Sequence, residues 1–261
     1  MLLRELTDQG VLRLTLNDPK HCNALSEYML AALGSALEKA EADPAVRVIV
    51  LAAIGSVFCA GHDLKEIHAK RNDADAGLSY FTNLFTNCCE VMQTIVNSPK
   101  IIIAEVAGVA TASGCQLVAS CDLAFATNHA QFATPGVNIG LFCSTPMVAL
   151  SRNMTNKHAM EMLLTGDMIS ANKAEQIGLI NRVVTSAEIT KHSMATATKI
   201  ASKSSMTLTT GKRAFHQQDN MSLADAYQHT SRVMVDNILK YDAREGIHAF
   251  ISKRVPTWQD E

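Results

Sequence analysis

Apolar residues follow distinct spacings along this 261-residue chain, and each spacing predicts a different kind of element. Residues Leu2–Leu6 and Val11–Leu16 resemble the two strands of a β-hairpin around Gly10. Residues 46–53 and Ile101–Val106 are short continuous apolar runs, which are typical of strands buried on both faces. The sequence therefore predicts a sheet whose inner strands have no polar side.

Helical spacing separates these predicted strands. Ser26 is a good N-cap for a helix that carries Leu30, Leu33 and Leu37 on one face. Residues 78–96 repeat apolar side chains at three- and four-residue intervals, which predicts a long amphipathic helix. Strand-like runs disappear after Ser186, and helices are predicted near residues 187–203 and 206–217, after Ser222, and ending at Phe250.

Strand, turn and helix recur over the first two-thirds of the chain, without detectable identity between the repeats. This order is typical of an α/β fold in which strand and helix units stack in a coil. We place a soft boundary near residue 200, with a core in residues 1–200 and a C-terminal helical region in residues 201–261. No low-complexity linker or repeat array marks it.

Composition narrows the class of protein. A hydrophobic content of 48% and a charged content of 18% are enough for a substantial core in a globular chain. The formal net charge of −2 provides no electrostatic footprint for nucleic acid or an anionic membrane surface, so we expect neither as a partner. The longest apolar runs fall far short of the roughly 20 residues that a membrane helix needs.

The seven cysteines form no CxxC pair and have no histidines at zinc-binding spacing, so we expect no metal site. We interpret them as buried thiols in a reducing compartment. Residues 1–10 resemble neither a secretory signal nor a transit helix. The sequence therefore predicts a cytoplasmic protein, or a mitochondrial matrix protein whose presequence has been removed.

Two runs of small residues follow predicted strands. Residues 58–64 read Phe, Cys, Ala, Gly, His, Asp, Leu, and residues 112–116 read Ala, Ser, Gly, Cys, Gln. Either run alone is also what an ordinary turn between core elements looks like. Together with residues 17–25 and 99–146 they resemble the enoyl-CoA hydratase/isomerase (crotonase) superfamily. The resemblance implies a crotonase-like spiral of repeated β-β-α units with a C-terminal helical trimerisation region.

Small residues let the main chain approach a ligand closely, and this suits the chemistry of a thioester. An enolate or tetrahedral species places negative charge on the carbonyl oxygen, and two backbone N–H donors aimed at that oxygen stabilise it strongly. The resemblance implies that the amides of His62 and Ser113 are these donors. Ser113 would also lie at a helix start, where the helix dipole favours negative charge.

The resemblance further implies that coenzyme A, as part of a substrate or ligand, is the only cofactor-like group. His21, Cys22, Ala24 and Ala60 would line its adenine and pantetheine, and Lys65 would bind its phosphates. Lys253 would reach in from a neighbouring subunit, which requires a homotrimer or a hexamer built from two trimers. The alternative that both lysines are solvated surface residues stays open.

The positions of the family's two catalytic glutamates hold Gln116 and Gly136. Hydration needs a base to activate water and an acid to protonate the α-carbon, each typically contributing 10²–10⁴-fold, and neither residue exchanges a proton near neutral pH. We therefore expect weak or absent hydratase activity, with partial restoration in a Gln116→Glu, Gly136→Glu double variant. The glycine-rich stretch that follows in the family is replaced by residues 141–146, so the acyl pocket is rebuilt.

Substitute proton carriers are few, and none is compelling. The candidates are His62, His68, Asn138, Cys143 and Ser144, whereas Asp63 and Asp122 are better explained as turn caps or acceptors for backbone donors. The His62 side chain is expected to be solvent-facing or structural, and Cys143 to be packing.

Three functions remain open. The chain is an acyl-CoA enzyme of the lyase or isomerase class, a catalytically silent acyl-CoA sensor or scaffold in fatty acid metabolism, or a structural partner with a degenerate pocket. Residues 110–120 and 133–145 resemble one group of the superfamily that lacks both glutamates.

Overall fold

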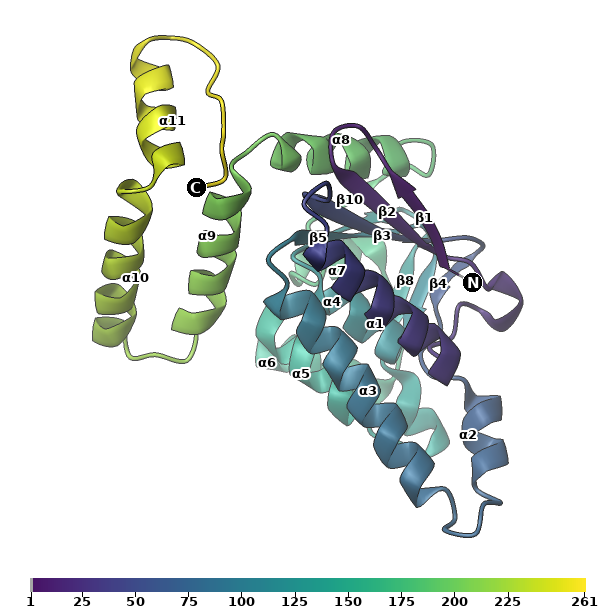
Figure 1. The fold of residues 1–261 in the computed structure, drawn as a ribbon. Helices are drawn as coiled ribbons and strands as arrows, with labels where there is room; N and C mark the ends of the chain where they lie inside the picture. The colour runs from purple at the N-terminus through teal and green to yellow at the C-terminus, as the bar shows by residue number, and fades with distance from the viewer. Residues whose placement is uncertain (1) are drawn as a thin grey trace.

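The computed structural model describes residues 2–261 and contains two sheets (Figure 1). The larger sheet has six strands in the order β1-β2-β3-β5-β7-β10, and all neighbours are parallel except β1 and β2. The predicted hairpin is confirmed, with Leu2 opposite Leu16 and Leu6 opposite Leu12. The strands are β1 (Leu2–Leu6), β2 (Val11–Leu16), β3 (Val48–Ala53), β5 (Ile101–Val106), β7 (Leu123–Thr127) and β10 (Arg182–Val184).

The smaller sheet consists of four very short strands, which the sequence analysis did not predict. They are β4 (Val57–Cys59), β6 (Val109–Thr111), β8 (Gln131–Ala133) and β9 (Ile169–Ser170). Three times the chain passes from a long strand of the first sheet to a short strand of the second and then into a helix. This confirms the spiral of β-β-α units.

Helices cover both faces of the larger sheet, which explains its continuous apolar strands. In β3, Ile49 and Leu51 pack into the main core with α1 and α3, whereas Val48 and Val50 pack with α8 on the other face. The helices of the core are α1 (Glu27–Ala42), α2 (Leu64–Lys70), α3 (Leu78–Asn97), α4 (Ser113–Ser120), α5 (Ser144–Asn153), α6 (Asn156–Thr165), α7 (Ala171–Gln176) and α8 (Ile189–Ala201).

The α1 helix begins as predicted, because the Ser26 hydroxyl accepts a hydrogen bond from the Met29 amide at 3.1 Å. Two short 3₁₀ helices complete the core, η1 (Pro19–His21) and η2 (Pro135–Ile139). Among residues 2–261 no helix has both the length and the apolar character that a membrane crossing requires.

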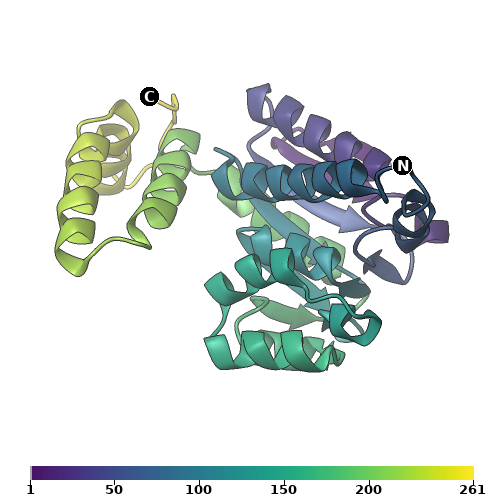
Figure 2. The same cartoon turned by 90° about the horizontal axis from the view of Figure 1, so that it is seen from below.

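Three further helices, α9 (Ser205–Gln218), α10 (Leu223–Ile238) and α11 (Tyr241–Ile251), form an arm to one side of the core (Figures 1 and 2). We call residues 205–251 the arm. Its helices lie where the sequence predicts them. The arm is tied to the core at Thr209, whose hydroxyl donates to the Pro99 carbonyl, and at Lys212, whose ammonium binds Asp122. The boundary near residue 200 stays a prediction.

The cysteines only partly match the expectation of buried thiols. All seven are free, and five are buried, but Cys22 is exposed and Cys89 is half-buried. Burial raises the pKa of the Cys59 and Cys115 thiols to about 12, so both stay protonated and unreactive.

Candidate functional site

The two small-residue turns lie against each other. They follow β4 and β6, which are parallel neighbours, so both strands end at the same edge of the smaller sheet. The Thr111 hydroxyl donates to the Ala60 carbonyl at 3.0 Å. A Cβ on Gly114 would lie 2.1 Å from the Cys59 carbonyl oxygen, so only glycine fits there. The turns therefore meet main chain to main chain.

Unusual backbone conformations shape both turns. Gly61 has a φ of +88°, and a Cβ there would lie 2.9 Å from the Ala112 Cβ and 3.2 Å from the Ser113 nitrogen. Ala112 has φ 49° and ψ −120°, a conformation that costs on the order of 1–3 kcal/mol for a residue with a side chain. It is held because its amide donates to the Ala133 carbonyl at 2.9 Å and its carbonyl accepts from the Gln116 amide at 3.0 Å. This bend makes Ser113 the first residue of α4.

The amides of His62 and Ser113 are neighbours without acceptors. Neither N–H donates to any acceptor within residues 2–261. The Ser113 nitrogen is 3.2 Å from the point where a Gly61 Cβ would stand, and His62 follows Gly61 directly. The structure thus brings together the two residues that we expect to act as donors. A carbonyl oxygen that gains negative charge needs such a pair, fixed in place before it binds.

The His62 side chain is packed and not directed at solvent. Its Nδ1 lies 3.3 Å from the Leu25 carbonyl oxygen, and its ring stacks edge-on against Phe85 with centroids 5.3 Å apart. Burial lowers the pKa of the imidazole, although the Leu25 contact opposes the shift. We expect the His62 side chain to be either solvent-facing or packed in a structural role, and it is packed.

The segment predicted to line coenzyme A packs beside the first turn. The Ala60 amide donates to the Cys22 carbonyl at 3.1 Å, and the Leu25 amide donates to the Gly61 carbonyl at 2.7 Å. His21 and Cys22 are exposed, whereas Ala24 is buried.

The residue that holds this segment was not predicted from the sequence. Asn23 is fully buried at φ 49°, its Oδ1 accepts from the Asp18 amide at 2.7 Å, and its Nδ2 donates to the carbonyls of Ile54 and Val57. Asparagine tolerates the left-handed backbone conformation better than most residues, so its presence at position 23 could have indicated a turn there.

The two predicted lysines lie at opposite ends of the molecule. Lys65 is exposed in the first turn of α2, where Asp63 caps the helix by accepting from the amides of Lys65 and Glu66. Lys253 is exposed just beyond α11, with a φ of 52°. The α2 and α11 helices are far apart in both ribbon views (Figures 1 and 2). One chain therefore does not bring both lysines to one ligand.

Gln116 and Gly136 occupy closed surroundings. Gln116 is only 4% exposed, and its Oε1 has no hydrogen-bond partner among residues 2–261. A Cβ on Gly136 would lie 2.5 Å from the Leu141 carbonyl oxygen and 2.9 Å from the Cys143 sulfur. The chain after η2 thus folds back over Gly136 and fills the space that a larger side chain would need.

Of the candidate proton carriers, only His62 lies in one of the two turns, and its imidazole is packed against Leu25 and Phe85. His68, Asn138 and Ser144 are exposed, and no hydrogen bond within residues 2–261 joins them to Gln116. Burial raises the pKa of Cys143, which keeps it a neutral thiol.

The acidic residues are committed elsewhere. As expected, Asp122 accepts from a backbone donor, the Ile102 amide, at 2.8 Å. Glu66 accepts from the Tyr80 hydroxyl and the Glu27 amide, and Asp63 serves as the cap of α2. Residues 2–261 contain no cluster of three or more His, Cys, Asp or Glu side chains that could hold a metal ion.

Comparisons with known proteins agree with the fold. A sequence model described as enoyl-CoA hydratase/isomerase matches residues 6–261. Mouse enoyl-CoA hydratase domain-containing protein 3, mitochondrial, is 48% identical over 250 residues, covering 95% of this chain and 81% of its own.

Two solved structures are similar over nearly the full length. The crystal structure of enoyl-CoA hydratase from Mycobacterium smegmatis matches with 47% identity and a TM-score of 0.93, covering 98% of each chain. That of human enoyl-CoA hydratase domain-containing protein 3 matches with 45% identity and a TM-score of 0.93, covering 98% of this chain and 99% of the other. These comparisons confirm the expected resemblance to the group that residues 110–120 and 133–145 indicate.

Proposed function

The chain belongs to the enoyl-CoA hydratase/isomerase family, and we propose that it binds an acyl-CoA thioester without carrying out ordinary hydration. In this proposal the thioester oxygen accepts hydrogen bonds from the amides of His62 and Ser113. The observation that carries the proposal is that these two amides are neighbours and have no acceptor within residues 2–261.

The coenzyme A part of the ligand would lie along the segment that packs on the first turn. His21, Cys22, Ala24 and Ala60 are candidates for its adenine and pantetheine, and the exposed Lys65 is a candidate for a phosphate. No other cofactor and no metal is part of this proposal.

The absence of ordinary hydratase chemistry follows from the surroundings of Gln116 and Gly136. A carboxamide does not exchange a proton near neutral pH, and each missing acid or base removes about 10²–10⁴-fold in rate. The carbonyl of Leu141 leaves no room at position 136 for a side chain. This crowding favours a silent acyl-CoA binder in lipid metabolism over an enzyme that keeps the family's acid/base arrangement.

We also propose a homotrimer or a hexamer, because the arm presents large apolar side chains to solvent. Leu223, Leu239 and Phe250 are 76%, 78% and 85% exposed. Such a surface on a single chain indicates a protein interface. In that assembly Lys253 of one subunit would reach the coenzyme A of another. The names of the relatives favour a mitochondrial protein over a cytoplasmic one.

A matched pair of ligands tests the proposal. Hexanoyl-CoA and hexyl-CoA differ in the carbonyl oxygen that the two amides would bind. Each neutral hydrogen bond contributes about 0.5–1.5 kcal/mol net, so hexanoyl-CoA should bind roughly 5- to 150-fold more tightly in isothermal titration calorimetry. Equal affinities would refute the role of the amides, and no binding of either ligand would refute the site. Crotonyl-CoA should bind without hydration, which the absorbance of its conjugated double bond reports.

A further inference from the structure

The last eight residues, 254–261, turn back from the end of α11, and we call them the strap. The Arg254 guanidinium binds the Glu245 carboxylate through two hydrogen bonds of 2.6 and 2.7 Å. The same carboxylate accepts from the Thr257 amide at 2.8 Å. These bonds lower the pKa of Glu245 to about 2, so the carboxylate stays charged. The beginning of the strap is therefore clamped to α11.

The end of the strap is held by a buried carboxylate. Asp242, in the first turn of α11, is 1% exposed and accepts from the amides of Gln259 and Asp260 at 2.8 and 3.0 Å. Its own amide donates to the main-chain oxygen of Glu261 at 3.1 Å. Because a buried carboxylate is costly without donors, Asp242 and the strap stabilise each other.

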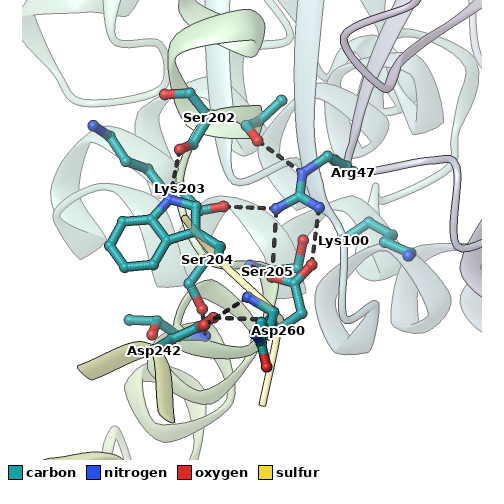
Figure 3. A network of polar contacts seen from close by, with 12 residues as sticks. Arg47, Lys100, Ser202, Lys203, Ser204, Ser205, Asp242 and Asp260 are labelled. Carbon is teal, nitrogen blue, oxygen red and sulfur yellow. Dashed lines mark hydrogen bonds and ion pairs between the residues drawn. The ribbon is translucent and has the colours of Figure 1, made fainter. Parts of the chain in front are cut away.

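Two side chains of the strap reach the connection between α8 and α9. The Trp258 indole donates to the Ser202 carbonyl at 2.9 Å, and Asp260 accepts from the Ser205 amide at 2.6 Å (Figure 3). Asp260 adopts a left-handed φ of 59°. The strap thus joins the two ends of the arm.

One arginine of the core completes the junction. Arg47, which immediately precedes β3, donates to the carbonyls of Ala201 and Lys203 at 2.8 Å each and to the Asp260 carboxylate at 2.9 Å (Figure 3). Partial burial raises the pKa of the Asp260 carboxyl, but the hydrogen bonds from Arg47 and the Ser205 amide outweigh it and hold that pKa below its usual value. A single guanidinium therefore connects the core, the segment that leads into the arm and the strap.

We propose that the strap is a positioning device that sets the direction of the arm and, with it, the place of Lys253. This inference rests on the proposed function, in which Lys253 binds the coenzyme A of a neighbouring subunit. Lys253 lies between α11 and Arg254, the first residue of the strap. A change of angle at residues 202–204 would carry it away from the neighbour.

The exposure of the junction supports positioning over simple stability. The side chains of Arg47 and Asp260 are 25% and 35% exposed, and ion pairs of this kind contribute little to folding. They still select one arrangement of two packed parts, because each of the three guanidinium nitrogens donates to an acceptor of the connection or the strap. Asp260 and Arg47 are positioning residues, since neither would touch the ligand.

Coenzyme A affinity of the assembled protein tests the inference. Asp260→Ala should weaken binding on the order of tenfold, as Lys253→Ala should, because each would remove one charge-assisted contact to a phosphate. The double variant should be no weaker than either single variant, because both changes remove the same contact. The matched control is Asp8→Ala in the turn between β1 and β2, which removes an exposed carboxylate that makes no ion pair among residues 2–261 and should change nothing.

The chain's single tryptophan gives a second measurement that needs no ligand. If Asp260→Ala releases the strap, acrylamide should quench Trp258 fluorescence more strongly than in the wild type. Unchanged quenching would refute the claim that Asp260 holds the strap in place. Two results would overturn the positioning of Lys253. One is stronger quenching of Trp258 in Asp260→Ala together with wild-type coenzyme A affinity. The other is a double variant whose loss of affinity equals the sum of the two single losses. If the wild-type protein binds no coenzyme A, the proposed function is refuted, and the positioning of Lys253 with it. Quenching of Trp258 would still test whether Asp260 holds the strap in place.

Discussion

Gly136→Ala is the smallest change that probes whether the carboxylate position is closed. The added Cβ would lie 2.5 Å from the Leu141 carbonyl oxygen and 2.9 Å from the Cys143 sulfur. Gly136 is not among the glycines with positive φ, so the cost comes from overlap and not from the backbone conformation. A carbonyl cannot rotate away as a side chain can, and the turn itself would have to move.

The size of the effect follows from two contributions. Overpacking a well-filled site typically costs 1–3 kcal/mol, and the displaced turn would also strain the hydrogen bond from the Leu141 amide to the Gly136 carbonyl, which contributes about 0.5–1.5 kcal/mol. We therefore expect Gly136→Ala to lower the free energy of unfolding by about 1.5–4.5 kcal/mol.

Two glycines serve as controls. Gly140→Ala has open space but a φ of +78°, and we expect it to cost about 1 kcal/mol. Gly211→Ala, in α9, has open space and ordinary φ, and should stabilise by about 0.5–1 kcal/mol.

The assay is urea unfolding of all three variants at one protein concentration, because assembly makes stability depend on concentration. If Gly136→Ala costs no more than Gly140→Ala, the turn over position 136 does not fill that space and the reasoning fails. The same geometry revises an expectation drawn from the sequence. A Gln116→Glu, Gly136→Glu double variant should recover no hydration of crotonyl-CoA, because the second carboxylate does not fit.

The buried ammonium of Lys212 donates to Asp122 at 2.8 Å and to two carbonyls, so Lys212→Met should destabilise by about 3–5 kcal/mol at neutral pH in the same unfolding assay. Because burial already raises the pKa of Asp122, the loss should shrink as the pH falls and the carboxyl is protonated; an equal loss at acidic pH would contradict this. Burial lowers the pKa of His62, so the unfolded chain binds this proton more readily, and stability should fall as the pH drops below about 6.5 toward the folded pKa. Melting temperatures between pH 5 and 8 should show a shallower slope in His62→Phe, and an unchanged slope would assign the effect to other groups.

The long elements were predictable because their patterns are local. The β3 strand is buried on both faces and reads as an unbroken apolar run, and α3 repeats its apolar side chains over five turns. The strands of the smaller sheet have only two or three residues, too few to show a period of two. Their pairing also depends on distant residues, as when Val57 lies opposite Val109.

The same distinction applies to the candidate site. Small residues predicted both turns from local sequence. The contact between Gly114 and Cys59 could not be predicted in this way, because it joins two different repeats of the spiral. The crowding at Gly136 depends on how residues 137–143 fold back, which their composition does not reveal. The pairing of Arg47 with Asp260 links positions 213 residues apart, and no local pattern indicates it.

If the proposed ligand binds at the two turns, their main-chain contact limits where its selectivity can change. Because Gly114 rests on the carbonyl of Cys59, a shift in one bend pushes the other, and any substitution there disturbs both donors at once. Residues 137–145 form no hydrogen bond with either bend, so new selectivity can arise more easily there. An engineer who wants a different acyl group should diversify that stretch and leave both bends alone.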